Sequence, residues 1–170
     1  YKNVVIATGS RSLFIPGLEP DGQQIITSTE ALDLTKPPLR LVVIGVGYIG
    51  LELGTYLSKV GSQVTVLEGG PAALAAMDQD CVNVVTRLLK KRGVEIITGA
   101  KAKACKKSGK GVEVTYEAGG ATKTLECDVV LVTVGRRPNS DGLGLEKIGL
   151  APNAKGFIDI DRSVSNHTFA

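Results

Sequence analysis

The chain has 170 residues, a formal net charge of +3 and a hydrophobic content of 43%, as is typical of a soluble globular protein. This length suits one domain of ordinary size, and the mild charge, without a dense run of Lys or Arg, argues against nucleic acid as a partner. The longest apolar stretch starts at Leu41, contains three glycines and stops at Glu52, so it cannot span a membrane. No secretory signal is visible.

The three cysteines, Cys81, Cys105 and Cys127, have neither CxxC spacing nor histidine neighbours. Such an odd, scattered set predicts no disulfide framework and no metal site. We expect buried thiols in a reducing compartment, which is the cytoplasm, or the mitochondrial matrix if the source is eukaryotic.

Two short elements open the chain. The apolar run after Asn3 predicts a strand at residues 3–7, which Thr8-Gly9-Ser10 ends before a connector rich in proline and glycine. Residues 27–34 then predict a helical turn that Ser28 or Thr29 caps.

The next segment is a glycine turn between a predicted strand at 41–44 and a predicted helix at about 47–60. The turn reads Gly45-Val46-Gly47-Tyr48-Ile49-Gly50, and Glu68 closes a second apolar strand at 63–67. Strand, GxGxxG, helix, strand and terminal acid in this order indicate a dinucleotide pocket. The helix should bury one stripe, formed by Ile49, Leu53, Leu57 and Val60.

Each part of this motif has a physical task. Gly45 allows the sharp turn, Gly47 lets backbone approach a pyrophosphate, and Gly50 lets the helix lie close to the sheet, with its N-terminal amides facing the anion. Glu68 can accept hydrogen bonds from a ribose diol and would repel a 2′-phosphate, which favours NAD over NADP. The alternative is a glycine-rich turn in another βαβ fold, with Glu68 merely solvated.

The second half begins with a predicted helix at 78–92 and a strand at 94–98. The apolar period then changes to two over residues 100–106, 112–117 and 122–127, which predicts a meander, and 129–134 forms an apolar strand at the sheet centre. We therefore predict an α/β fold: a Rossmann-like, three-layer domain with a parallel sheet and a three-stranded antiparallel meander in place of one crossover helix.

The chain also contains an internal echo. Residues 4–11 (VVIATGSR) and 130–137 (VLVTVGRR) both place an apolar strand before a small residue, a glycine and an arginine. Strand ends of this kind bind ligands in open α/β sheets, although chance explains so short a repeat equally well on spacing alone.

Three segments carry a family resemblance: LVVIGVGYIGLELG at 41–54, VTVLE at 64–68 and VGRRPN at 134–139. They resemble the flavoprotein pyridine nucleotide-disulfide oxidoreductases, and residues 142–150 and 156–161 are most similar to the dihydrolipoamide dehydrogenase branch. The resemblance covers essentially the whole chain. It implies the central NAD-binding segment of an oxidoreductase that passes electrons from dihydrolipoyl groups through a redox-active disulfide and FAD to NAD⁺.

The resemblance also implies a domain organisation. Residues 1–27 match the end of an FAD-domain segment and a linker, 28–135 match the inserted NAD-binding domain, and 136–170 match the start of the return into the FAD domain. The echo then marks the two crossings between the domains.

Cofactor contacts follow in the same way. Gly45, Val46, Gly47, Tyr48, Ile49, Gly50 and Leu51 match the pyrophosphate turn and the helix start behind it, and Glu68 matches the acid that binds the adenosine ribose. Ala102 matches a position beside adenine, and Gly135 one beside the nicotinamide half. Thr8, Gly9 and Ser10 match positions that face the flavin nucleotide.

For two positions the residues also allow a structural role in place of the cofactor contact that the resemblance implies. Glu52 matches an acid beside the nicotinamide and flavin rings, but it also suits the first turn of a helix. Tyr48 matches a residue that covers the flavin in some relatives, and packing in the core is equally compatible with a tyrosine.

Several family motifs do not occur in the sequence: the first GxGxxG, the CxxxxC disulfide, the later FAD motif and the C-terminal His-Glu pair. His167 is the single histidine, and we expect it to be a surface or packing residue. The residues present thus predict no catalytic group and no metal ligand, and a segment that binds NAD without turning over lipoamide.

In the parent enzyme the resemblance implies bound FAD, a homodimer, and lipoyl-bearing subunits of 2-oxoacid dehydrogenase complexes as partners; the segment alone should be monomeric. Two alternatives remain. One is the corresponding segment of a glutathione or mercuric reductase, although those that use NADP carry Arg or Lys where Gly69 and Gly70 stand. The other is a stand-alone nucleotide-binding module.

Overall fold

The computed structural model describes residues 3–109 and 111–161, so His167 lies outside the described residues. The chain forms two compact units: Phe14–Gly135 is the larger, and Tyr1–Leu13 with Arg136–Ala170 is the smaller. Residues 14–27, interpreted above as part of a linker, contribute Leu18, Ile25 and Ile26 to the core of the larger unit.

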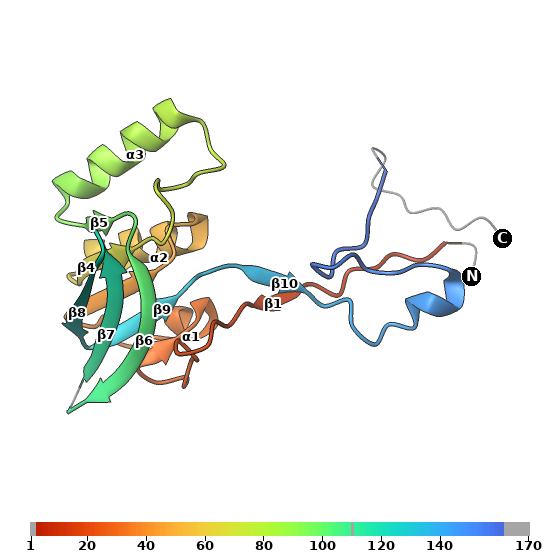
Figure 1. Cartoon of the computed structure of the whole chain (residues 1–170), viewed down its shortest axis with the longest axis horizontal. Helices are drawn as coiled ribbons and strands as arrows, with labels where there is room; N and C mark the ends of the chain where they lie inside the picture. Colours follow the sequence, from red (N-terminus) through yellow and green to blue (C-terminus); the bar gives the residue numbers. More distant parts are fainter. Residues whose placement is uncertain (1–2, 110, 162–170) are drawn as a thin grey trace. The chain divides into compact units, whose positions relative to one another are not determined.

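A five-stranded parallel sheet forms the centre of the larger unit (Figure 1). Its central strand is β3 (Arg40–Ile44), with β9 (Val129–Val132) and then β2 (Ile25–Ile26) on one side. On the other side lie β4 (Gln63–Leu67) and then β5 (Glu95–Ile97). The apolar strand β9, predicted at the sheet centre, lies next to the central strand and is paired on both sides.

Two layers cover the faces of this sheet. The helices are α1 (Ser28–Leu32), α2 (Tyr48–Lys59) and α3 (Gln79–Lys91), and the meander comprises β6 (Lys101–Ser108), β7 (Gly111–Ala118) and β8 (Ala121–Cys127). Leu41 and Val43 of β3 pack into one core cluster with residues of all three helices. Val42 and Ile44 pack into a second cluster with the meander. Because both faces of the strand are covered, residues 41–44 are all apolar, and only Arg40 at the exposed start of the strand is charged.

The meander lies in the sequence between β5 at one edge of the sheet and β9 on the other side of β3, so it makes the crossover that a helix makes in simpler Rossmann folds. The predicted α/β fold with a parallel sheet and an antiparallel meander is confirmed.

The buried stripe of α2 agrees only in part with the predicted one: Leu57 is buried and Leu53 packs against the core, as predicted. Its buried residues are Gly50, Leu51, Gly54 and Leu57, whereas Val60 is 46% exposed. Gly54 faces the sheet, and a Cβ there would lie 3.5 Å from side-chain carbons of both Val43 and Val64. The prediction was wrong for Val60 and missed Gly50 and Gly54, because it followed the large apolar residues while glycines form part of the contact face.

The first helix also differs in its cap. Thr27, rather than Ser28 or Thr29, is the N-cap of α1, and it forms a capping box with Glu30. The Thr27 hydroxyl accepts from Thr29 N at 3.2 Å, and the Thr27 amide donates to Glu30 Oε2 at 2.8 Å. Reciprocal bonds of this kind satisfy two otherwise unpaired amides.

The smaller unit is built on a two-stranded antiparallel ribbon of β1 (Ser10–Ser12) and β10 (Arg136–Pro138), and it also contains a 3₁₀ helix, η1 (Leu145–Ile148). Arg11 lies opposite Arg137, so the ends of the two echo segments are neighbours. The predicted strand at residues 3–7 is wrong: within the described residues this segment pairs with no other strand, and Val5 is 88% exposed.

Candidate functional site: a cleft at the glycine turn

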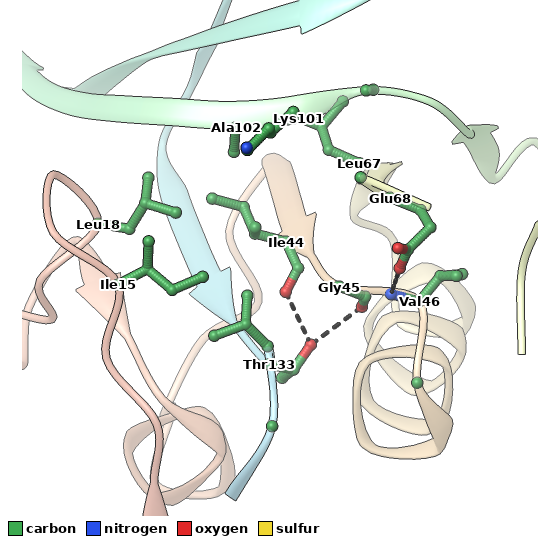
Figure 2. A pocket seen from close by; sticks show the side chains of 15 residues that line it. Ile15, Leu18, Ile44, Gly45, Val46, Leu67, Glu68, Lys101, Ala102 and Thr133 are labelled. Atoms are coloured by element: carbon green, nitrogen blue, oxygen red, sulfur yellow. Dashed lines mark hydrogen bonds between the residues drawn. The ribbon is translucent and has the colours of Figure 1, made fainter. Parts of the chain in front are cut away.

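A cleft of about 540 Å³ opens at the carboxyl ends of β3, β4 and β9 (Figure 2). All of its lining residues belong to the larger unit. This is the edge at which open α/β sheets bind ligands. The lining residues are Ile15, Leu18, Ile44, Gly45, Val46, Gly47, Leu67, Glu68, Gly69, Ala100, Lys101, Ala102, Thr133, Val134 and Gly135.

The fold itself requires two of the three motif glycines. Gly45 has φ +97°, and a Cβ there would lie 2.6 Å from the backbone oxygen of Thr133. A Cβ on Gly50 would lie 2.5 Å from Thr133 Oγ1 and 3.1 Å from a methyl of Val43. A side chain at either position would therefore push α2 or the turn away from the sheet.

The fold does not require glycine at position 47. Gly47 has φ −75°, a value open to any residue, and a Cβ there would meet nothing within 4 Å. It is the N-cap of α2, and no side chain caps this helix end. The first amides of α2 are thus left for a ligand, and the open space at Gly47 lets an anion approach them closely.

Glu68 stands at the tip of β4 with its carboxylate tied to the turn. Its Oε2 accepts the amide of Val46 at 2.9 Å, and its Oε1 accepts the amide of Gly70 at 2.6 Å. A carboxylate can accept about four hydrogen bonds, so about two positions remain for hydroxyl groups of a ribose. The sequence predicted the acid but not its tether to the motif.

The predicted site residues fall into three groups. Six of them line the cleft: Gly45, Val46, Gly47, Glu68, Ala102 and Gly135. Five others, Tyr48, Ile49, Gly50, Leu51 and Glu52, form the start of α2 behind the turn. The last three, Thr8, Gly9 and Ser10, belong to the smaller unit.

The positions of Tyr48 and Glu52 bear on the structural roles given above as alternatives to a cofactor contact. Tyr48 is 61% exposed, so it does not pack in the core of this chain. Glu52 is exposed and lies beyond the first turn of α2, so a helix-end role does not account for it.

The polar groups of residues 8–10 are engaged inside the smaller unit. The Thr8 hydroxyl donates to the Asn139 carbonyl at 2.6 Å, and the Asn139 amide donates to the Gly9 carbonyl at 3.0 Å. Ser10 Oγ accepts from Arg136 Nε at 2.7 Å. These bonds hold the ribbon of β1 and β10 together.

Sequence reasoning missed one wall of the cleft. Ile15 and Leu18 reach it because the connector lies along β6: Cys105 N donates to the Gly17 carbonyl at 2.8 Å. A Cβ on Gly17, whose φ is +88°, would lie 2.5 Å from the backbone oxygen of Lys103. No local signal marks this non-local contact.

Thr133 and Lys101 were missed as well. Thr133 follows the apolar strand β9 directly, and a polar residue at this point of the sequence was the one signal that could have identified it. Lys101 begins β6 and places an exposed cation on the cleft (Figure 2).

The cysteines lie away from this cleft. Burial raises the pKa of Cys105 to about 12 and that of Cys127 to about 11, so both are protonated at neutral pH. Cys81 is exposed, contrary to the expectation of buried thiols, because α3 turns Val82 and Leu89 toward the core instead. Within residues 3–109 and 111–161 no group of three His, Cys, Asp or Glu could hold a metal ion, and no helix there is long and apolar enough to cross a membrane.

Comparisons with known proteins agree with this architecture. Residues 1–168 match the family described as pyridine nucleotide-disulphide oxidoreductase. A dihydrolipoyl dehydrogenase of Geobacillus stearothermophilus is 48% identical over 162 residues, which cover 95% of this chain and 34% of that protein. One from Staphylococcus aureus is 48% identical over 170 residues, covering 98% of this chain and 36% of its own length.

Solved structures give the same result. The crystal structure of LpdA from Mycobacterium tuberculosis superposes with a TM-score of 0.82 at 33% identity, over 91% of this chain and 33% of LpdA. The HOCl-induced flavoprotein disulfide reductase RclA from Escherichia coli gives 0.77 at 30% identity, over 91% of this chain and 35% of RclA. The chain spans about a third of the length of the curated relatives it matches. It belongs to the pyridine nucleotide-disulphide oxidoreductase family.

Proposed function

We propose that this chain is the NAD(H)-binding segment of a dihydrolipoyl dehydrogenase-type flavoenzyme. The observation that carries the proposal is Gly47, a motif glycine that the fold does not require and that leaves open space before the uncapped start of α2. The identity of 48% to dihydrolipoyl dehydrogenases supports the enzyme type.

The residues of the cleft fit a dinucleotide. The amides at the start of α2 bind the pyrophosphate, and the helix dipole adds to the attraction. Glu68 accepts hydrogen bonds from the adenosine ribose, with Ala102 beside the adenine. Ile15, Leu18 and Val134 provide apolar walls that exclude water, and Gly135 leaves room for the nicotinamide half. The bound nucleotide supplies the hydride acceptor, and this chain supplies its position.

We propose that the parent enzyme, the longer flavoprotein to which this segment belongs, also binds FAD. There, residues 8–10 face the nucleotide part of FAD, and electrons arrive from dihydrolipoyl groups carried by 2-oxoacid dehydrogenase complexes. The parent is a homodimer of the cytoplasm or the mitochondrial matrix. Selectivity for NAD follows from the charge of Glu68 and from glycines, rather than cations, at positions 69 and 70.

Calorimetric titration of the chain with NADH and NADPH tests the nucleotide site. We expect NADH to bind at millimolar concentration or below and more tightly than NADPH. Replacing Glu68→Ala should weaken NADH binding by roughly tenfold or more, since hydrogen bonds to a charged group contribute about 1.5–3 kcal/mol. The ratio between the two nucleotides should narrow, because the charge that repels a 2′-phosphate is lost.

The matched control is Glu146→Ala, which removes an exposed acid from the smaller unit and should change neither affinity. Absence of NADH binding at millimolar concentration would overturn the proposed function. An unchanged NADH to NADPH ratio in Glu68→Ala would show that Glu68 does not discriminate between the nucleotides.

A further inference from the structure

One peptide unit of the turn is held from both sides. The carbonyl of Gly45 lies 3.1 Å from Thr133 Oγ1, and the amide of Val46 donates to Glu68 Oε2 at 2.9 Å (Figure 2). These two groups belong to the same trans peptide, so they are coplanar and point in opposite directions. Thr133 and Glu68 therefore contact opposite edges of a single rigid peptide plane.

The Thr133 hydroxyl has one proton and two carbonyls within reach, Ile44 at 3.0 Å and Gly45 at 3.1 Å. The Ile44 carbonyl already accepts the backbone amide of Thr133 at 2.8 Å. A carbonyl oxygen has two lone pairs, so this bond leaves both carbonyls open to the hydroxyl, which links Ile44 and Gly45. Its contact with Gly45 lies at the residue whose φ of +97° sets the direction of the turn.

Thr133 and Glu68 lie at the ends of two different strands, on the sides of the cleft proposed for the two halves of the nucleotide. Thr133 follows β9 and adjoins Val134 and Gly135, on the side proposed for the nicotinamide half. Glu68 follows β4, on the side proposed for the adenosine ribose. Strand β3 and its turn lie between them.

We propose that Thr133 is a positioning residue for nucleotide binding: its hydroxyl orients the Gly45–Val46 peptide, and that peptide orients the Glu68 carboxylate. The inference rests on the proposed nucleotide site and deepens it. It makes Thr133 and Glu68 one coupled unit, so the ends of β9 and β4 do not contribute independently to affinity.

The surroundings of Thr133 define the informative variants. A Cβ on Gly50 would lie 2.5 Å from Thr133 Oγ1, so the hydroxyl lies close against the start of α2. Thr133→Val keeps the shape but puts a methyl against the Gly45 carbonyl, and Thr133→Ser keeps the hydroxyl. Thr133→Ala serves as a second hydroxyl-free variant if valine impairs folding. Thr65→Val, at a half-buried position of β4 that is not among the cleft residues, is the matched control.

The first experiment is a double-variant cycle on NADH affinity, with Thr133→Val, Glu68→Gln and the pair. We expect Thr133→Val to weaken NADH binding about fivefold, the effect of losing about one hydrogen bond, and Thr133→Ser to stay within about twofold of the original chain. The double variant should lose NADH affinity by a factor clearly smaller than the product of the factors measured for the two single variants. If the loss of affinity in the double variant equals the product of the two single losses to within about twofold, the coupling is overturned. Equal NADH affinity of the Thr133→Val and Thr133→Ser variants would overturn it as well.

The second experiment needs no nucleotide. Hydrogen exchange of the Val46 amide, followed by NMR in the ligand-free chain, should be faster in Thr133→Val and in Thr133→Ala than in Thr133→Ser or Thr65→Val. An unchanged exchange rate in the hydroxyl-free variants would overturn the inference even if NADH binds. If the original chain fails to bind NADH, the proposed function is wrong, and this measurement still decides whether Thr133 holds the turn.

Discussion

The three motif glycines illustrate how single residues divide between fold and function. Gly45 and Gly50 lie against the end of β9, where a Cβ would come within 2.6 Å of Thr133. Gly47 faces open space at an ordinary φ of −75°. The same residue type thus serves packing at two positions, and at the third it leaves the open space that we propose for the ligand.

This division predicts opposite outcomes for two alanine substitutions. Gly50→Ala should lower the free energy of unfolding by about 1–3 kcal/mol, because the added methyl overpacks the contact between α2 and β9. Gly47→Ala should lower the free energy of unfolding by less than about 1 kcal/mol, which is the difference between glycine and alanine at an N-cap. It should nevertheless weaken NADH binding at least tenfold, because the added methyl obstructs the pyrophosphate. Urea denaturation and NADH titration of both variants measure the two effects. Equal losses of stability would contradict the assignment.

At the scale of elements, the connector segment at residues 14–27 belongs to the larger unit and forms a wall of the cleft rather than a free linker. Asp21 accepts the amides of Gln23, Gln24 and Ile25 at 2.8–2.9 Å, and it pairs with Lys107 of β6 at 2.8 Å. Desolvation opposes ionisation, but the bonds from Lys107 and the three amides outweigh it and hold the pKa of Asp21 well below its usual 3.8. The connector is thereby fastened to the meander beside Ile15 and Leu18.

The lowered pKa predicts a pH-dependent contribution to stability. A depressed carboxylate pKa stabilises the fold above the unfolded value of 3.8, and this contribution is lost as pH falls through the folded pKa. Asp21→Asn should therefore be less stable than the original chain at pH 7, by up to about 1 kcal/mol for a partly exposed pair. Thermal unfolding from pH 7 to pH 2 should show this gap shrinking below about pH 4. A gap independent of pH would contradict the role of the charge.

At the scale of the whole molecule, the cleft is complete within one compact unit. All of its lining residues lie in Phe14–Gly135, whereas the ribbon of β1 and β10 organises the smaller unit. The relatives are about three times as long as this chain, and the proposed electron transfer from dihydrolipoyl groups concerns a protein of that length.

This division predicts that a chain of residues 14–135 alone binds NADH with an affinity within about threefold of the 170-residue chain, or about 0.7 kcal/mol. The physical reason is that both core clusters and the whole cleft lining lie in that unit. Circular dichroism establishes that the shorter chain folds, and calorimetry compares the affinities. A folded unit with affinity reduced more than tenfold would show that the smaller unit contributes to the site.

The sequence by itself determined the features that depend on neighbours along the chain. The apolar run of β3, the turn at Gly45 and the acid at Glu68 are local signals, and the change of period after residue 100 was enough to predict the meander. These elements follow from backbone sterics and from alternating burial, which act over a few residues.

Only the tertiary structure decided which faces and side chains meet. The buried stripe of α2 depends on how closely Gly50 and Gly54 approach the sheet, and the segment at 3–7 is no strand because no described strand pairs with it. Ile15 and Thr133 reach the cleft from parts of the chain more than a hundred residues apart. Such contacts result from packing between layers, which no short stretch of sequence specifies.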